Sequence, residues 1–127
     1  DEIDMSGPFG AEYYEAEPRV VVLAGGPGVG PAVGIGERAI ADDNAVHIVY
    51  RATEPVHETR LSALNAAGGT VTITDADGFP AAVDEAVTAA ADEQVFVYGF
   101  DAFVTAATDA IAAAGGDPDA AKVENFG

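Results

Sequence analysis

Apolar runs alternate with amphipathic stretches along residues 18–127. Residues 19–24 form an apolar run that ends in glycines, as expected for a parallel strand buried on both faces. Similar runs predict further strands at residues 45–50, 70–74, 94–98 and 122–124. The stretches between them predict helices at residues 31–40, 59–67, 80–91 and 101–114. This alternation predicts an α/β fold, a doubly wound parallel sheet of about five strands with helices on both faces.

Residues that start and stop helices support these boundaries. Pro31 and Pro80 suit first helical turns, and Asp101 suits the N-cap of the last helix. Glycine pairs at residues 68–69 and 115–116 suit helix ends. A chain of 127 residues fits one compact domain, which we expect at residues 18–127, with residues 1–17 outside the alternating pattern.

The charge balance narrows the range of partners. The chain has 22 Asp and Glu against 5 Lys and Arg, a net charge of −17. Such a surface repels phosphate backbones and anionic lipid headgroups, so we expect no binding to nucleic acid or to membrane surfaces. The carboxylates are scattered, and the composition resembles that of halophilic, haloarchaeal cytosolic proteins. We expect molar salt to screen the repulsion between them and to stabilise the fold.

Missing residue types and patterns limit the chemistry further. The sequence has no cysteine, which excludes disulfides, thiolate metal ligands and a cysteine nucleophile. We find neither an apolar run near the ~20 residues of a membrane helix nor a signal-peptide pattern, and we expect a cytoplasmic protein without membrane insertion. His47 fits a strand, and His57 fits a loop with no second ligand at metal-site spacing, so we assign no metal.

The segment after the first predicted strand is the strongest candidate for a binding site. Ligands of such sheets bind at the carboxyl ends of the strands, near the point where the strand order reverses. Glycines there allow close approach of the backbone, and a following helix N-terminus suits a pyrophosphate. A flexible turn is the alternative, because neither the strict GxGxxG pattern nor a Walker A loop is present. The candidate residues are Gly25, Gly26, Pro27, Gly28, Val29, Gly30 and Pro31.

Four other segments form an ordered set of motifs together with this loop. They are GPFG at residues 7–10, Tyr50-Arg51, YGFDAFV at residues 98–104 and VENFG at residues 123–127. In this order the chain resembles ferredoxin reductase-type flavoproteins, whose loop reads GGxGxxP and whose fourth-strand segment begins with cysteine where this chain has Tyr98. The resemblance implies an NAD(P)-binding domain at residues 18–127, with residues 1–17 as the end of a flavin-binding barrel or an interdomain linker.

The resemblance also implies where the reacting rings lie. The nicotinamide would lie between the loop at residues 25–31 and the segment that holds Gly99, Phe100, Asp101 and Phe103, facing a flavin. Gly99 would let the ring approach the backbone, and Phe126 corresponds to a C-terminal aromatic near the flavin in some members. These two are the candidate catalytic positions. The alternatives are a plain strand-to-helix turn for Gly99 and a residue filling the edge of the core for Phe126.

The implied reaction is hydride transfer from NAD(P)H to FAD or FMN. The flavin would be held by a barrel absent from this chain, so the chain alone is expected to be incomplete as an enzyme. Expected partners are a flavin-binding domain or subunit and an unidentified electron acceptor. The alternative function is a non-catalytic NAD(P)H-binding regulatory or electron-transfer subunit.

Two acidic residues after the third predicted strand favour NADH over NADPH. Plant-type members of the family hold the ribose 2′-phosphate there with a Ser-Arg pair. This chain has Asp75 and Asp77, whose carboxylates would repel a phosphate and accept hydrogen bonds from a free ribose hydroxyl. Arg51 is the nearby cation that could reverse this preference. The alternative is that both acids belong to a solvated turn.

Overall fold

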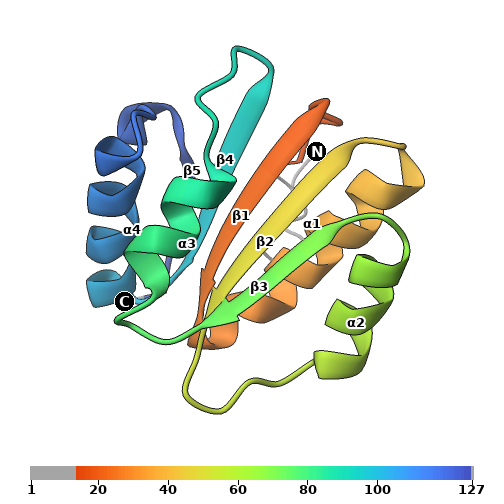
Figure 1. Cartoon of the computed structure of the whole chain (residues 1–127), viewed down its shortest axis with the longest axis horizontal. Helices are drawn as coiled ribbons and strands as arrows, with labels where there is room; N and C mark the ends of the chain where they lie inside the picture. The colour runs from red at the N-terminus through yellow and green to blue at the C-terminus, as the bar shows by residue number, and fades with distance from the viewer. Residues whose placement is uncertain (1–13, 127) are drawn as a thin grey trace.

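Five parallel strands form one sheet in the computed structural model, which describes residues 14–126. Their order across the sheet is β3-β2-β1-β4-β5, and every neighbouring pair is parallel (Figure 1). The predicted fold class is confirmed, while the GPFG segment at residues 7–10 lies outside the described residues. The strands are β1 (Arg19–Gly25), β2 (Ala45–Arg51), β3 (Thr70–Thr74), β4 (Glu93–Gly99) and β5 (Lys122–Asn125).

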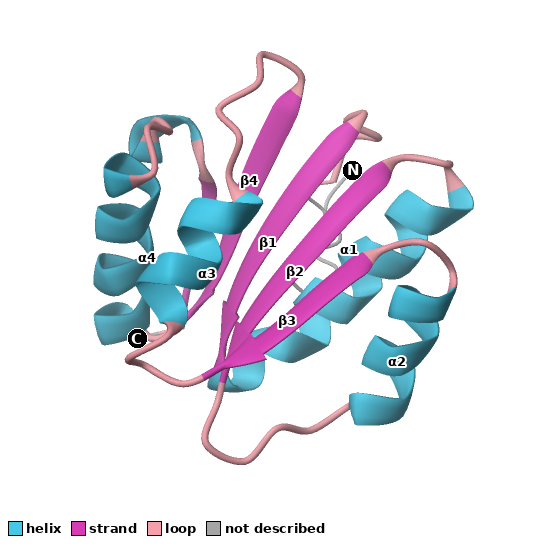
Figure 2. Ribbon diagram, viewed as in Figure 1, coloured by secondary structure: helices cyan, strands magenta, loops and turns pink. Residues whose placement is uncertain are grey.

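Helices cover both faces of the sheet. Figure 2 shows α3 and α4 in front of the sheet and α1 behind it. Alternate residues of the central strand β1 supply the two cores, because Val20 and Val22 pack on the α1 and α2 side, and Val21 and Leu23 pack on the α3 and α4 side. Among the described residues, no helix has the length and apolarity to span a membrane. The helices are α1 (Val29–Ala41), α2 (Glu58–Ala66), α3 (Phe79–Ala86) and α4 (Asp101–Ala113), with short 3-10 turns η3 (Gly26–Gly28) and η4 (Pro118–Ala120).

The first helix begins earlier than predicted. Val29 is its first residue, so Pro31 is the third residue of α1 rather than the first. A proline fits there because the first N–H groups of a helix have no partner within the helix. Only Gly26–Gly28 forms a separate turn, and the other residues of the predicted loop belong to β1 or α1.

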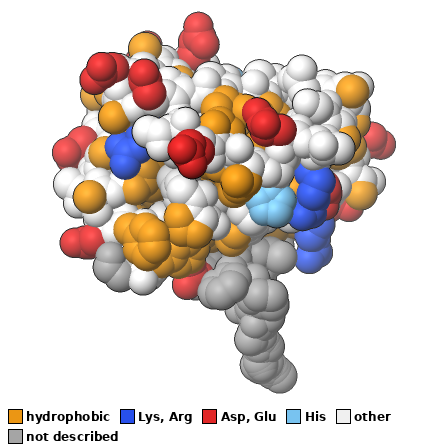
Figure 3. Space-filling model, turned by 90° about the horizontal axis from the view of Figure 1, so that it is seen from below, with side chains coloured by type: hydrophobic (Ala, Val, Ile, Leu, Met, Phe, Trp, Pro, Cys, Tyr) orange, Lys and Arg blue, Asp and Glu red, His pale blue; other side chains and the backbone are white. Residues whose placement is uncertain are grey.

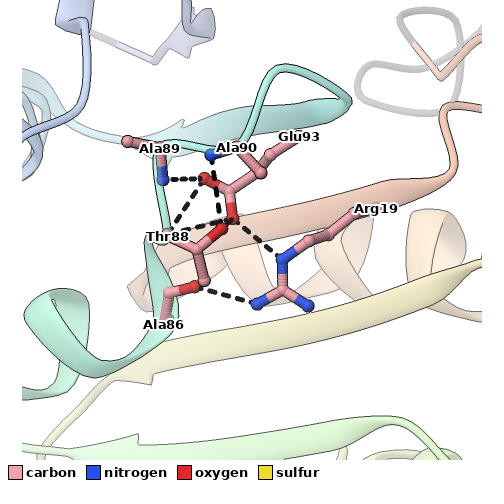
Figure 4. A network of polar contacts seen from close by, with 6 residues as sticks. All are labelled: Arg19, Ala86, Thr88, Ala89, Ala90 and Glu93. Atoms are coloured by element: carbon pink, nitrogen blue, oxygen red, sulfur yellow. Dashed lines mark hydrogen bonds and ion pairs between the residues drawn. The ribbon is translucent and has the colours of Figure 1, made fainter.

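The third helix ends at Ala86, five residues before the predicted end at residue 91, because a buried glutamate binds the next backbone amides. The carboxylate of Glu93 accepts hydrogen bonds from the amides of Thr88 at 3.1 Å and Ala89 at 3.0 Å (Figure 4). Arg19 Nε donates to the same carboxylate at 2.9 Å. In a longer helix these amides would bond to helix carbonyls. Here they bond to Glu93 instead, so the helix stops before them.

The N-cap of the last helix lies one residue before the predicted one. Phe100 is the N-cap of α4, and Asp101 is its first helical residue, so the N-cap assignment of Asp101 was wrong. The Asp101 carboxylate instead accepts a hydrogen bond from Asn125 Nδ2 at 3.0 Å. A contact across 24 residues therefore uses the side chain that the local pattern assigned to a cap.

Candidate functional site

The strand order reverses between β1 and β4, and the predicted site lies at their carboxyl ends. The chain passes from β1 outward through β2 and β3, and then returns to β4 beside β1. Figure 3 looks onto this edge of the molecule, where apolar side chains gather among exposed acidic ones. In open α/β sheets the crevice at such a reversal is where ligands bind.

Three glycines at this edge differ in conformation and in the space around them. Gly26 has a φ of +53°, a conformation that favours glycine, and it is exposed. Gly28 is buried, and a β-carbon there would overlap the carbonyl oxygen of Tyr98. A β-carbon at Gly30 would meet no atom within 4 Å. The space left by Gly28 is thus filled by β4, which differs from the sequence prediction of space for a ligand.

The aromatic ring of Phe103 fills the space beside two further glycines. A β-carbon on Gly25 would lie 2.5 Å from this ring, and one on Gly99 would lie 2.6 Å from it. Phe103 is 3% exposed. Gly99 therefore makes room for Phe103 in this structure, whereas the sequence prediction was room for the nicotinamide ring. Tyr98, which stands where ferredoxin reductase-type flavoproteins usually have cysteine, is fully buried in the core on the α1 side.

Two grooves flank the glycine turn and share Pro27. The first, which we call the strand-2 groove, has a volume of about 580 Å³ and lies at the ends of β2 and β3. The second, which we call the strand-5 groove, has a volume of about 520 Å³ and lies at the ends of β4 and β5. The strand-2 groove is lined by Gly26, Pro27, Tyr50, Arg51, Ala52, Thr53, Glu54, Val56, Asp75 and Ala76. The strand-5 groove is lined by Pro27, Pro31, Phe100, Glu124, Asn125 and Phe126.

The strand-5 groove carries exposed aromatic surface. Phe100 is 51% exposed, and its ring meets the ring of Phe126 edge-on at 5.9 Å between centroids. The amide of Phe126 donates to the carbonyl of Gly99 at 2.9 Å, which holds the end of the chain against β4. The two predicted catalytic positions, Gly99 and Phe126, are therefore adjacent in space.

Arg51 differs from the other cations of the chain. Its guanidinium lies 4.8 Å from the ring centroid of Phe103 and 5.6 Å from that of Phe79, and it lines the strand-2 groove. No carboxylate within residues 14–126 forms a salt bridge with it. By contrast, the ion-paired cations are Arg19 with Glu93, Arg60 with Glu37, and Lys122 with Glu15 and Glu17, while Arg38 lies over the Tyr14 ring.

The structure separates the two aspartates that the sequence put together. Asp75 lines the strand-2 groove, and its Oδ1 accepts a hydrogen bond from the amide of Gly78 at 2.9 Å. Asp77 is exposed in the same turn but lies outside the groove. Only Asp75 is therefore placed to affect a ligand there.

Sequence reasoning did not single out several residues that line the grooves. These are Thr53, Glu54 and Val56 in the segment after β2, and Asn125 at the end of β5. Their position just after parallel strands was the signal that could have identified them, because all such ends meet at one edge.

Neither histidine lines a groove. Burial, together with the charge of Arg19, lowers the pKa of His47, whose Nε2 is 3.0 Å from Thr72 Oγ1 on the next strand. His57 precedes α2 with a φ of 59°. In the part of the chain that the structure describes, no three His, Asp or Glu side chains gather as a metal site.

The fold has a counterpart among solved structures. No protein-family model matches the chain, and no curated protein matches its sequence. Among solved structures, the Amycolatopsis cytochrome P450 reductase GcoB matches with a TM-score of 0.65 and 22% sequence identity. The match covers 97% of this chain and 41% of that one, so this chain spans about two fifths of the reductase. The chain therefore shares its fold with part of a reductase, in agreement with the fold that its motifs predicted.

Proposed function

We propose that this chain binds NAD(P)H along the carboxyl edge of the sheet and presents the nicotinamide to a flavin held by another domain or subunit. The single observation that carries the proposal is the pair of grooves on either side of the glycine turn, joined at Pro27. A dinucleotide has two nucleoside halves joined by a pyrophosphate, and this shape fits two grooves with a helix N-terminus between them.

The charges at the site support an anionic ligand. In a chain with a net charge of −17, three of the five cations are paired with glutamates, whereas Arg51 lines the strand-2 groove and has no carboxylate partner among residues 14–126. Phe103 and Phe79 contact the guanidinium through their rings, and within residues 14–126 no hydrogen bond uses its N–H donors, which are therefore available to a ligand. We assign Arg51 to the phosphates of the nucleotide.

The strand-5 groove supports the other half of the proposal. Its exposed Phe100 and adjacent Phe126 offer flat apolar surface to a nicotinamide and to an isoalloxazine ring. Bound NAD(P)H supplies a hydride, and FAD or FMN accepts it; the chain contributes binding and orientation. Because the chain spans 41% of the reductase it resembles, we infer that the flavin comes from a further domain or subunit.

The test is a titration of the intact chain in molar KCl with NADH and NADPH. We expect Arg51→Gln to weaken binding by about tenfold, because a charge-assisted hydrogen bond contributes about 1.5 kcal/mol or more. The matched control is Arg60→Gln, which removes an exposed arginine paired with Glu37 on the α1 and α2 side. Equal affinity of the Arg51→Gln and Arg60→Gln variants would contradict the assignment, and failure of the wild-type chain to bind either nucleotide would contradict the function.

A second measurement separates the reductase from a non-catalytic subunit. The flavin-loaded complex with its flavin domain is mixed with NADH under anaerobic conditions, and the absorbance of oxidised flavin is followed. Bleaching at a rate that depends on NADH supports hydride transfer. Binding of NADH without bleaching would support the non-catalytic alternative.

A further inference from the structure

Tyr50 is a buried tyrosine at the inner side of the strand-2 groove. Its side chain is 1% exposed, and it is the penultimate residue of β2. Its hydroxyl oxygen accepts a hydrogen bond from the amide of Val56 at 3.1 Å. Val56 lines the same groove and is 53% exposed. The hydroxyl therefore joins the core to the outer end of the groove wall.

The groove wall is the segment at residues 52–56, which is anchored at its two ends. The amide of Ala52 donates to the carbonyl of Thr74 on β3 at 3.0 Å, and the amide of Val56 donates to Tyr50. Within the described residues, no further hydrogen bond ties residues 53–55 to the rest of the fold. Loss of the Tyr50 hydroxyl would leave the wall held by hydrogen bonds at one end only.

The hydrogen of the same hydroxyl is available to a ligand. A tyrosine hydroxyl donates one hydrogen bond in addition to those it accepts. Tyr14 uses both capacities, donating to Asp42 at 2.8 Å and accepting from Asn44 at 2.9 Å. Within residues 14–126, Tyr50 has no acceptor for its O–H hydrogen. A buried donor without an acceptor costs free energy, and a groove ligand with an oxygen acceptor removes that cost.

We propose that Tyr50 is a binding and positioning residue for the ADP-ribose half of the nucleotide, holding the groove wall through Val56 and donating its O–H to a ligand oxygen. The proposal rests on the proposed function, in which the nicotinamide occupies the strand-5 groove and the ADP-ribose half occupies the strand-2 groove. It assigns a binding role to a residue whose ring is otherwise part of the core.

The experiment compares Tyr50→Phe with Tyr14→Phe in the intact chain, in molar KCl. Both variants remove one hydroxyl that accepts a hydrogen bond, and the Tyr14 hydroxyl lies at the opposite edge of the sheet, beside Asp42 and Asn44. The probes are ADP-ribose and nicotinamide mononucleotide, titrated calorimetrically. We expect the Kd for ADP-ribose to rise about three- to tenfold in Tyr50→Phe and to stay at the wild-type value in Tyr14→Phe. Binding of nicotinamide mononucleotide should be equal in all three proteins.

A second readout does not depend on affinity. Hydrogen exchange of the Val56 amide should be faster in Tyr50→Phe than in the wild type, and unchanged in Tyr14→Phe. In the wild-type chain, the Val56 amide resonance should shift on addition of ADP-ribose and not of nicotinamide mononucleotide. The resonance shift is measured on the wild-type chain, so it tests the proposal even if the Tyr50→Phe variant does not fold.

The outcomes distinguish this inference from the function on which it rests. Wild-type chain that binds no NADH, NADPH or ADP-ribose would overturn the proposed function and the ligand contact together. Wild-type binding of ADP-ribose with an unchanged affinity in Tyr50→Phe would overturn only the role of Tyr50. Equal weakening of both probes would overturn the assignment of Tyr50 to the ADP-ribose half.

Discussion

The two edges of the sheet differ in how their charged side chains are paired. At the amino edge, Arg19 and Glu93 form an ion pair, Tyr14 bonds to Asp42 and Asn44, and Lys122 bonds to two glutamates. At the carboxyl edge, Arg51 has no carboxylate partner among the described residues, and two grooves are open. The same five strands thus end in a network of ion pairs on one side and, among the described residues, beside an arginine without a carboxylate partner on the other.

This difference separates stability from function. The side chain of Glu93 is 2% exposed, and its carboxylate accepts hydrogen bonds from Thr88, Ala89 and Arg19, which fixes the turn between α3 and β4 (Figure 4). Such a group contributes to folding and has no capacity left for a ligand. Arg51 and Tyr50 retain N–H and O–H donors at a groove, which is the arrangement expected where a ligand completes the hydrogen bonds.

The largest effect should come from the glycine that joins the site to the fold. Gly28→Ala places a β-carbon against the Tyr98 carbonyl, and we expect the free energy of unfolding to fall by about 3 kcal/mol, as for other overpacked sites. Gly30→Ala is the control, because its β-carbon meets no atom within 4 Å, and its stability should stay within about 1 kcal/mol of wild type. Denaturant unfolding in molar KCl measures both. Similar stability of the two variants would mean that the turn does not pack on β4 as described.

The next effect tests the polar network of the amino edge. Glu93→Gln removes the charge that pairs with Arg19, and we expect a loss of about 2 kcal/mol in the free energy of unfolding because charge-assisted hydrogen bonds weaken. The affinity for nucleotide should not change, since Glu93 lies at the edge opposite the grooves. Arg51→Gln should show the reverse pattern, with weaker binding and near-normal stability. A loss of nucleotide binding in Glu93→Gln would contradict the conclusion that the amino edge contributes to stability and not to binding.

The same carboxylate predicts a dependence of stability on pH. Burial raises the pKa of Glu93, but hydrogen bonds from Thr88, Arg19 and Ala89 outweigh burial and hold the pKa below its ordinary value. Because the folded-state pKa is the lower one, this contribution is complete above the ordinary glutamate pKa and is lost as the pH falls through the folded-state value. Unfolding measured between neutral pH and pH 3 should therefore show a steeper acid loss for the wild type than for Glu93→Gln. Parallel curves would contradict the role of Glu93.

The smallest expected effect sharpens the choice of nucleotide at the carboxyl edge. Asp75→Asn keeps an oxygen that can accept from the Gly78 amide and removes a charge from the strand-2 groove. We expect the ratio of NADPH to NADH affinity to rise by about threefold, since a nearby carboxylate repels the 2′-phosphate weakly at high salt. Asp77→Asn, outside the groove, is the control and should leave the ratio unchanged. A wild-type preference for NADPH would instead indicate that Arg51 holds the 2′-phosphate.

The alternation of apolar runs was enough to predict the sheet and its helices. β3 was predicted with its observed ends. β1, β2 and β5 end one residue later than predicted, and β4 is longer than predicted by one residue at each end. The glycine turn, Arg51 and Asp75 could also be placed at the site, because residues that follow parallel strands share one edge. These features depend on local sequence and on a topology rule, so they required no knowledge of distant contacts.

Other features depended on contacts between residues far apart in the chain. Gly28 meets Tyr98, Arg19 meets Glu93 across 74 residues, and Asn125 meets Asp101 across 24. These contacts determined which glycines pack rather than face a ligand, where α3 ends, and why Asp101 is not a cap. Only the tertiary structure showed that Arg51 has no carboxylate partner in the described part of the chain and that the Tyr50 hydroxyl bonds to the Val56 amide, because donors and acceptors are paired by distance in space and not by spacing in the sequence.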